Sequence, residues 1–270
     1  SGPNGGAISL NVVGGLLRIK RCAFVNNVCG SGSGGAIQSG SPLDISGSSN
    51  VFNGNIAGVY GGAIYSSASL TIRNCFFTNN ASASHGGAIN GTVAGAENLF
   101  SNCIFTANAS SGGWGGTYYL NGASTNTFDA CTFVANTAGS GGARNGGAIC
   151  MNVAGGLLQV RNCAFTSNVC PGPGANGGAI YSTSPVQIYG SNNVFYGNVA
   201  SAGDGGAIYG SAANAANVFS NCTFTANATP SGGALGGAVY LSGTSSTNIL
   251  MNCAFIANIA TNASARGGGV

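Results

Sequence analysis

The chain has 270 residues, of which 49 are glycine, and only 4% carry a charged side chain, where a typical soluble domain has about 25%. The absence of a three-residue glycine period excludes a collagen helix, and the hydrophobic content of 44% disfavours disorder. A net charge of +3, with Arg18, Lys20 and Arg21 as its only tight group, disfavours nucleic-acid binding, and no run of 18 apolar residues could span a membrane.

The residue types that are present indicate an extracellular location. Ten cysteines occur without a CxxC pair or a Cys/His cluster, a usage typical of secreted proteins rather than of metal sites. So few charges provide little repulsion between molecules, so we expect the chain to be glycosylated or packed against copies of itself. No initiator methionine or signal sequence is present, and we expect a processed product or a segment, without a cofactor.

A short repeat begins at residue 5 and recurs to the end of the chain. Gly-Gly followed by a small and then an apolar residue starts at positions 5, 34, 61, 86, 115, 146, 177, 205, 236 and 267, with spacings of 25 to 31 residues. One Phe-x-x-Asn motif lies between each neighbouring pair. Such regularity is the signature of a solenoid.

Each period contains three predicted strands in a fixed order. Gly-Gly-Ala-Ile-x comes first, an alternating stretch such as Leu70 to Ile72 comes second, and Cys-x-Phe comes third. We therefore predict an all-β fold, a parallel β-helix of about nine coils forming one domain over residues 1–270. Matching segments, such as 4–30 with 145–171, further predict a duplication into residues 1–141, with five coils, and residues 142–270, with four.

The Phe-x-x-Asn motif supplies two internal columns. At about 4.8 Å between coils, each motif phenylalanine would stack on the next, giving a stack of Phe24, Phe52, Phe77, Phe105, Phe133, Phe165, Phe195, Phe224 and Phe255. The asparagine amides would bond from coil to coil, giving a ladder of Asn27, Asn55, Asn80, Asn108, Asn136, Asn168, Asn198, Asn227 and Asn258. The simplest interpretation is that these residues only hold the fold.

Seven cysteines lie two residues before a motif phenylalanine and should point inward with it. They are Cys22, Cys75, Cys103, Cys131, Cys163, Cys222 and Cys253. The coil spacing lies within the disulfide range, so pairs such as Cys75 with Cys103 and Cys222 with Cys253 are one interpretation and a stack of buried thiols is the other. Cys29 and Cys170 occupy matching turn positions and could close local loops with Cys22 and Cys163.

The residue after Gly-Gly-Ala-Ile should point outward, and there the sequence has Tyr65, Tyr119, Tyr181, Tyr209 and Tyr240. The last three occupy consecutive coils and predict an exposed aromatic ladder, either a contact surface for a sugar or neighbouring filament, or simple cross-strand stacking. Among the Asn-x-Ser/Thr sequons, Asn90 and Asn262 are the better glycosylation candidates because they lie outside the ladder.

Catalytic groups are sparse. The four acids, Asp44, Glu97, Asp129 and Asp204, fall in different coils and at different phases of the repeat, which disfavours the close carboxylate pair of a glycosidase. His85 stands alone before a Gly-Gly, where we expect a solvated turn residue. We therefore predict that the protein is not an enzyme.

The pairing of GGA(I/V) with FxxN along the whole chain resembles the repeat of the chlamydial polymorphic outer membrane proteins, also found in surface proteins of some algae and other protists. The resemblance implies a right-handed parallel β-helix exposed at a cell surface, where the bacterial regions act as adhesins. No segment resembles their C-terminal membrane barrel.

The repeat also bears on function. Because residues 1–8 begin as one coil and residues 266–270 begin another, we expect either that the chain is cut from a longer array or that coils of different copies stack end to end. The predicted function is a structural building block of an extracellular filament or cell-surface appendage, with the chain itself as partner. The alternative is an adhesin passenger that binds a host receptor or glycan.

Overall fold

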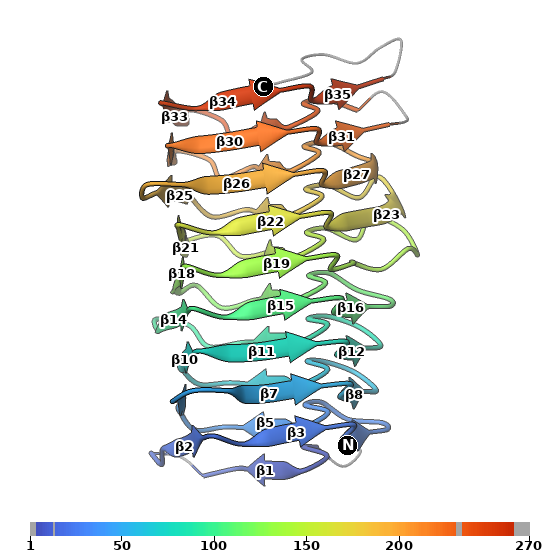
Figure 1. The fold of residues 1–270 in the computed structure, drawn as a ribbon, viewed down its shortest axis with the longest axis vertical. Helices are drawn as coiled ribbons and strands as arrows, with labels where there is room; N and C mark the ends of the chain where they lie inside the picture. Colours follow the sequence, from blue (N-terminus) through green and yellow to red (C-terminus); the bar gives the residue numbers. More distant parts are fainter. Residues whose placement is uncertain (1–3, 13, 231–233, 262–270) are drawn as a thin grey trace.

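The computed structural model describes residues 4–12, 14–230 and 234–261, which form a stack of about nine parallel β-coils (Figure 1). The predicted fold class is confirmed. Each coil contributes one strand to each of three sheets, and every strand pairs in parallel with strands of the coils above and below it. None of the described residues forms a helix long and apolar enough to cross a membrane.

The first sheet, here called sheet A, contains the strands that follow each Gly-Gly. In spatial order these are β1 (Ile8–Leu10), β5 (Ile37–Ser39), β9 (Ile64–Ser66), β13 (Ile89–Gly91), β17 (Tyr118–Leu120), β20 (Ile149–Met151), β24 (Ile180–Ser182), β28 (Ile208–Gly210) and β32 (Val239–Leu241). Sheet B contains the alternating stretches, namely β2 (Leu17–Lys20), β6 (Leu43–Ser46), β10 (Leu70–Arg73), β14 (Glu97–Ser101), β18 (Thr125–Asp129), β21 (Leu157–Arg161), β25 (Val186–Tyr189), β29 (Ala216–Ser220) and β33 (Thr247–Met251).

Sheet C carries the motif phenylalanines. Its strands are β3 (Ala23–Val25), β7 (Asn50–Asn53), β11 (Cys75–Thr78), β15 (Ile104–Thr106), β19 (Thr132–Val134), β22 (Ala164–Thr166), β26 (Asn193–Tyr196), β30 (Cys222–Thr225) and β34 (Ala254–Ile256). The register aligns equivalent residues, so that Phe77 lies opposite Phe52 on one side and Phe105 on the other.

Most coils also have a short fourth strand, so the prediction of three strands per coil was incomplete. These strands follow the motif asparagine and form two four-stranded sheets, of β4 (Val28–Cys29), β8 (Ile56–Ala57), β12 (Ala81–Ser82) and β16 (Ala109–Ser110), and of β23 (Val169–Pro173), β27 (Val199–Ala202), β31 (Ala228–Thr229) and β35 (Ile259–Ala260). Isolated bridges through Thr137 link the two. The asparagine turns the chain, and the residues after it then have free backbone groups that pair with the next coil.

The Gly-Gly pair makes the corner that leads into sheet A. Gly61 has a φ of 61°, and a Cβ there would lie 2.0 Å from the carbonyl oxygen of Ile64. A Cβ on Gly62 would lie 2.1 Å from the carbonyl oxygen of Gly87 in the next coil. Only glycine fits both positions, because one needs a left-handed backbone and the other is in contact with the neighbouring coil.

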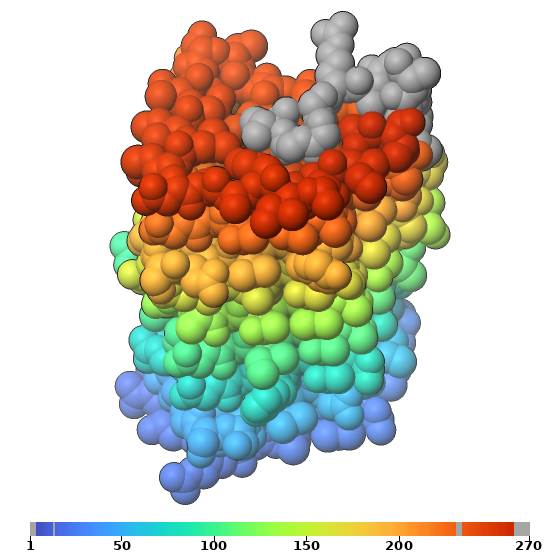
Figure 2. All heavy atoms as spheres, turned by 45° about the horizontal axis from the view of Figure 1, so that its top comes forward, coloured from blue at the N-terminus to red at the C-terminus, as the bar shows by residue number. Residues whose placement is uncertain are grey.

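The core runs the length of the stack between the three sheets. Ring centroids of consecutive motif phenylalanines lie 4.6 to 5.0 Å apart, with near-parallel planes. This interval equals the spacing between paired strands, so each ring is stacked by the backbone register itself. The space-filling view shows the coils as tightly packed layers (Figure 2).

Candidate functional site

An asparagine ladder runs through all nine coils. The side-chain Nδ2 of each ladder residue donates to Oδ1 of the next over 2.9 to 3.0 Å. That Oδ1 also accepts the backbone N–H of the same donor residue. The other hydrogen on Nδ2 is donated to the backbone carbonyl of the motif phenylalanine in the preceding coil. An internal asparagine thus satisfies every polar group of its side chain.

The ladder has a direction, so its two ends differ. Within the described residues, no donor reaches Oδ1 of Asn27 in the first coil, and the backbone N–H of Asn258 in the last coil has no acceptor. One end therefore offers an acceptor and the other offers donors. The two ends are complementary in the sense needed for head-to-tail stacking of two copies.

The last described coil also presents side chains that are buried elsewhere. Leu250 of β33 occupies the inward position that Phe219 occupies one coil earlier, and the two residues are paired in register. Phe219 is fully buried, whereas 37% of Leu250 is exposed. Core positions are therefore exposed to solvent at this end of the described stack.

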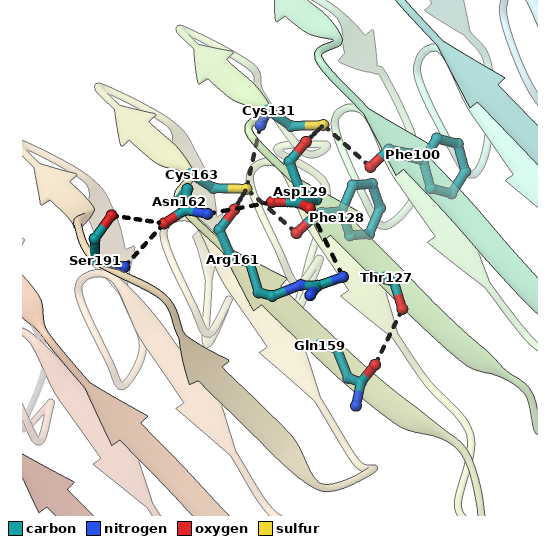
Figure 3. Close-up of polar contacts among 10 residues, drawn as sticks. All are labelled: Phe100, Thr127, Phe128, Asp129, Cys131, Gln159, Arg161, Asn162, Cys163 and Ser191. Atoms are coloured by element: carbon teal, nitrogen blue, oxygen red, sulfur yellow. Dashed lines mark hydrogen bonds and ion pairs between the residues drawn. The ribbon is translucent and has the colours of Figure 1, made fainter.

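The cysteines before the motif phenylalanines line the inside corner between sheets B and C (Figure 3). The thiol of Cys131 donates to the carbonyl of Asp129 at 3.4 Å, and Sγ of Cys163 accepts the backbone N–H of Cys131 at 3.3 Å. Seven thiols donate to the carbonyl two residues earlier, namely those of Cys22, Cys75, Cys103, Cys131, Cys163, Cys222 and Cys253.

In the structure these seven cysteines are free thiols, which is one of the two interpretations that the sequence leaves open. Because Cys75, Cys103, Cys222 and Cys253 are free, the structure contains neither the Cys75–Cys103 nor the Cys222–Cys253 bridge. Because Cys22 and Cys163 are free, neither local loop to Cys29 or Cys170 is closed. Each sulfur is instead directed along the corner by its bond to the carbonyl two residues earlier.

The thiols influence one another through these contacts. The pKa of the Cys75 thiol is raised by its hydrogen bond with Cys103 and by burial. Hydrogen bonds from Cys131 and Cys75 lower the pKa of the Cys103 thiol between them. Burial raises the pKa of the Cys131 thiol.

The acids lie apart from one another. Asp44 pairs with Arg18 over 3.4 Å, and Asp129 pairs with Arg161 over 3.7 Å on the outside of sheet B (Figure 3). Asp204 accepts the backbone N–H of Leu235 at 2.7 Å. The part of the chain that the structure describes holds no group of three potential metal ligands.

The predicted tyrosine surface lies on the outside of sheet A. Rings of Tyr181 and Tyr209 stack at 5.1 Å with planes 9° apart, and Tyr240 continues the column at 5.5 Å with a tilt of 37°. All three side chains are half-buried. Cys150, the next residue of this column, is fully buried, although its position predicted an outward side chain.

Further along the same face is an aromatic cluster that sequence reasoning missed. It consists of Tyr60, Tyr65, His85, Trp114 and Tyr119. The imidazole of His85 lies 4.5 Å from the ring of Tyr119, 5.3 Å from Trp114 and 5.5 Å from Tyr60. Tyr119 lies in the column that was expected to point outward, yet only 5% of it is exposed, because His85 and Trp114 pack against it.

His85 is a half-buried member of this cluster, so the expectation of a solvated turn residue was wrong. Its Nδ1 accepts the backbone N–H of Trp114 at 3.1 Å. Burial, followed by the nearby charge of Arg144, lowers its pKa. In other coils the residue before Gly-Gly is Asn145, Asn176 or Asp204, and each accepts the equivalent N–H of the next coil.

Asn90 was predicted as a glycosylation site, but only 2% of it is exposed. It lies in β13, in register with Tyr65 of the coil before and Tyr119 of the coil after. Its Oδ1 is buried and has no hydrogen-bond partner. Asn262, the other candidate, lies outside the described residues.

Two family models match the chain. One is described as a right handed beta helix region and matches residues 6–190. The other is described as a Chlamydia polymorphic membrane protein repeat and matches residues 194–211, a segment with one Phe-x-x-Asn and one Gly-Gly motif. No curated protein and no solved structure matches the chain.

One sequence signal could have located the aromatic cluster. The residue before Gly-Gly is aromatic in three consecutive coils, as Tyr60, His85 and Trp114, and polar or aliphatic in the others. Placed beside the column after Gly-Gly-Ala-Ile, this run would have indicated an aromatic corner.

Proposed function

The chain belongs to the right-handed β-helix family, and from that premise we propose that it is a structural building block of an extracellular filament or cell-surface appendage. Its polymorphic membrane protein repeat is typical of proteins associated with the outer membrane or cell surface. Subunits would join by stacking the last coil of one copy on the first coil of another, without catalysis.

The observation that carries this proposal is the complementarity of the two ends of the asparagine ladder. In a head-to-tail stack, the N–H and Nδ2 of Asn258 would donate to Oδ1 of Asn27 in the next copy. Nδ2 of that Asn27 would in turn reach the carbonyl of Phe255. Each bond would repeat one already made between neighbouring coils, so stacking would be strand addition to an exposed sheet edge.

Apolar burial supports the same proposal. Leu250 at the C-terminal end and Leu17 at the N-terminal end are inward-facing side chains that remain partly exposed. Stacking would remove both from water at about 25 cal/mol for each Å² of apolar surface. A further coil of the same chain would cover the exposed groups of the last coil equally well. The experiment below distinguishes such a coil from a second copy of the chain.

The test compares two lysine substitutions in β33. Leu250→Lys places a charge on the stacking surface, whereas Met251→Lys places one on the neighbouring outward position and serves as the matched control. We expect electron microscopy to show fibres for the unmodified chain and for Met251→Lys, and single particles for Leu250→Lys. Single particles for the unmodified chain, or unchanged fibres for Leu250→Lys, would contradict the proposal.

The alternative function, an adhesin passenger that binds a receptor or glycan, is favoured by the stacked rings of Tyr181 and Tyr209 on the outer face. A monodisperse monomer that binds cells, and loses this binding when both tyrosines are changed to serine, would favour the alternative.

A further inference from the structure

A pocket of about 170 Å³ opens on the outer face of sheet A, in the coils that carry the aromatic cluster. Its lining residues are Tyr60, His85, Asn90, Thr92, Tyr119 and Asn121. A cavity of about 150 Å³ holds a benzene molecule, so this pocket has room for one six-membered ring.

Aromatic rings form one wall of the pocket. Tyr60 and His85 stack with planes 10° apart, and His85 and Tyr119 stack with planes 28° apart. The faces of such rings carry partial negative charge and attract the slightly positive C–H groups of a flat aliphatic ring. A wall of this kind favours a ligand with one apolar face.

Polar groups in the lining favour a ligand that also carries hydroxyl groups. The buried Oδ1 of Asn90 has no donor in the structure, and buried polar atoms are nearly always hydrogen-bonded. Nδ1 of His85 accepts the N–H of Trp114, so the proton of the neutral imidazole resides on Nε2. Thr92 and Asn121 add a hydroxyl and an amide to the lining.

The lining contains no carboxylate and no lysine or arginine. His85 is the one residue in it that can become cationic near neutral pH, and its pKa is lowered by burial and by Arg144. An ion brought into the pocket would meet no fixed charge of opposite sign in the lining itself, which is costly in a partly desolvated site. The pocket is therefore suited to an uncharged ligand.

We propose that this pocket binds one neutral pyranose ring, as the terminal sugar of a glycan. The apolar face of the sugar would lie against the rings of His85 and Tyr119, and a sugar hydroxyl would donate to Oδ1 of Asn90. This inference goes beyond the structural function, because it depends on the side of the solenoid and not on its ends.

The test uses Trp114 as a built-in reporter, since it is the only tryptophan in the chain and its ring lies 5.8 Å from that of Tyr119. Fluorescence is followed while methyl β-D-glucopyranoside, methyl β-D-galactopyranoside or the methyl glycoside of N-acetylglucosamine is added. A ligand this small should bind with a dissociation constant of about 1 mM. We expect a saturable change with at least one of the three, and none with the open-chain polyol sorbitol.

Variants separate binding from folding. Asn90→Leu fills the same space without an orphaned acceptor, so the melting temperature should stay equal or rise while sugar affinity falls at least tenfold. Gln38→Leu makes the matched change in the same column, outside the pocket lining, and should leave affinity unchanged. No saturable change with any of the three sugars, an equal response to sorbitol, or unchanged affinity in Asn90→Leu would overturn the proposal.

Discussion

Two stretches of the outer face of sheet A differ in their surroundings although they share one column of positions. At Tyr119 the corner residues His85 and Trp114 fold over the column, and 5% of the tyrosine is exposed. At Tyr209 the corner residue before the strand is Asp204, and the ring stacks half-buried between Tyr181 and Tyr240.

The interior beneath the two stretches is the same. Asn108 and Asn198 each donate the same three hydrogen bonds, and rings of the phenylalanine stack lie at the same interval in both. Each coil contacts only its neighbours, so a corner residue can change without disturbing the rest. The repeat therefore preserves the fold while the residues flanking Gly-Gly determine the surface chemistry.

The largest expected effect tests whether the asparagine ladder contributes equally to stability beneath the two stretches. Asn108→Ala and Asn198→Ala each remove four side-chain hydrogen bonds and leave buried partners unsatisfied, which should cost about 4 kcal/mol of unfolding free energy in each case. Urea unfolding measures the loss of unfolding free energy in the two variants. Asn258→Ala, at the partly exposed end of the ladder, should cost only about 1 kcal/mol. A difference above about 1 kcal/mol between the two internal variants would show that the interiors are not equivalent.

The second prediction tests the difference between the surfaces. Tyr119→Ala empties a buried site and should cost about 3 kcal/mol, as deletion of a large buried side chain does. Tyr209→Ala removes a half-buried cross-strand pair and should cost about 1 kcal/mol. Equal losses in thermal unfolding would mean that the corner residues do not shelter Tyr119.

The third prediction concerns pH and the only histidine in the chain. Because folding lowers the pKa of His85 below its ordinary value of 6.5, the unfolded chain takes up a proton more readily than the folded one. The stabilisation is complete above pH 6.5 and is lost as the pH falls through the lower pKa of the folded state. Protonation would also end the acceptance of the Trp114 N–H by Nδ1.

His85→Asn provides the control for this prediction. An asparagine before Gly-Gly accepts the same N–H in other coils, as at Asn145, and does not titrate. Thermal unfolding of the variant should be flat between pH 7 and the onset of carboxylate protonation at about pH 4. A parallel decline in both proteins would refute the role assigned to His85.

The smallest expected effect compares the same turn, just before the ladder asparagine, in two internal coils. Ala135 and Ala226 precede ladder asparagines with φ of 53° and 54°, where an alanine is strained and Gly54 or Gly197 stands in other coils. Ala135→Gly and Ala226→Gly should each stabilise the protein by about 0.5 kcal/mol, because relief of strain slightly exceeds the added chain entropy. Destabilisation in either variant, measured by urea unfolding, would count against a strained turn.

Sequence reasoning could predict the fold because its determinants repeat at fixed spacing. The periodic positions of Phe77 and Asn80 and the alternation from Leu70 to Ile72 each indicate a strand or turn, and nine repetitions remove ambiguity. The fourth strand was missed because Ala81–Ser82 is too short to show alternation and forms only by pairing with other coils.

The candidate pocket could not be predicted in the same way. The burial of Tyr119 depends on His85 and Trp114, which lie outside the strands at the position before Gly-Gly, where most other coils have polar or aliphatic residues. The position of Asn90 after Gly-Gly-Ala-Ile indicates the outer face, but it does not indicate that the residue is buried there. The aromatic run before Gly-Gly could indicate the corner, but the pocket beside that corner becomes visible only in the structure.

The central claim, that copies stack head to tail through their coil ends, is tested most directly by the axial repeat of fibres formed by the purified chain. Nine coils at about 4.8 Å give a subunit length of about 43 Å. Cryo-electron microscopy should show continuous strand spacing through the junction and a subunit repeat near that length. Fibres whose subunits join side by side, or a chain that stays monomeric at high concentration, would contradict the account.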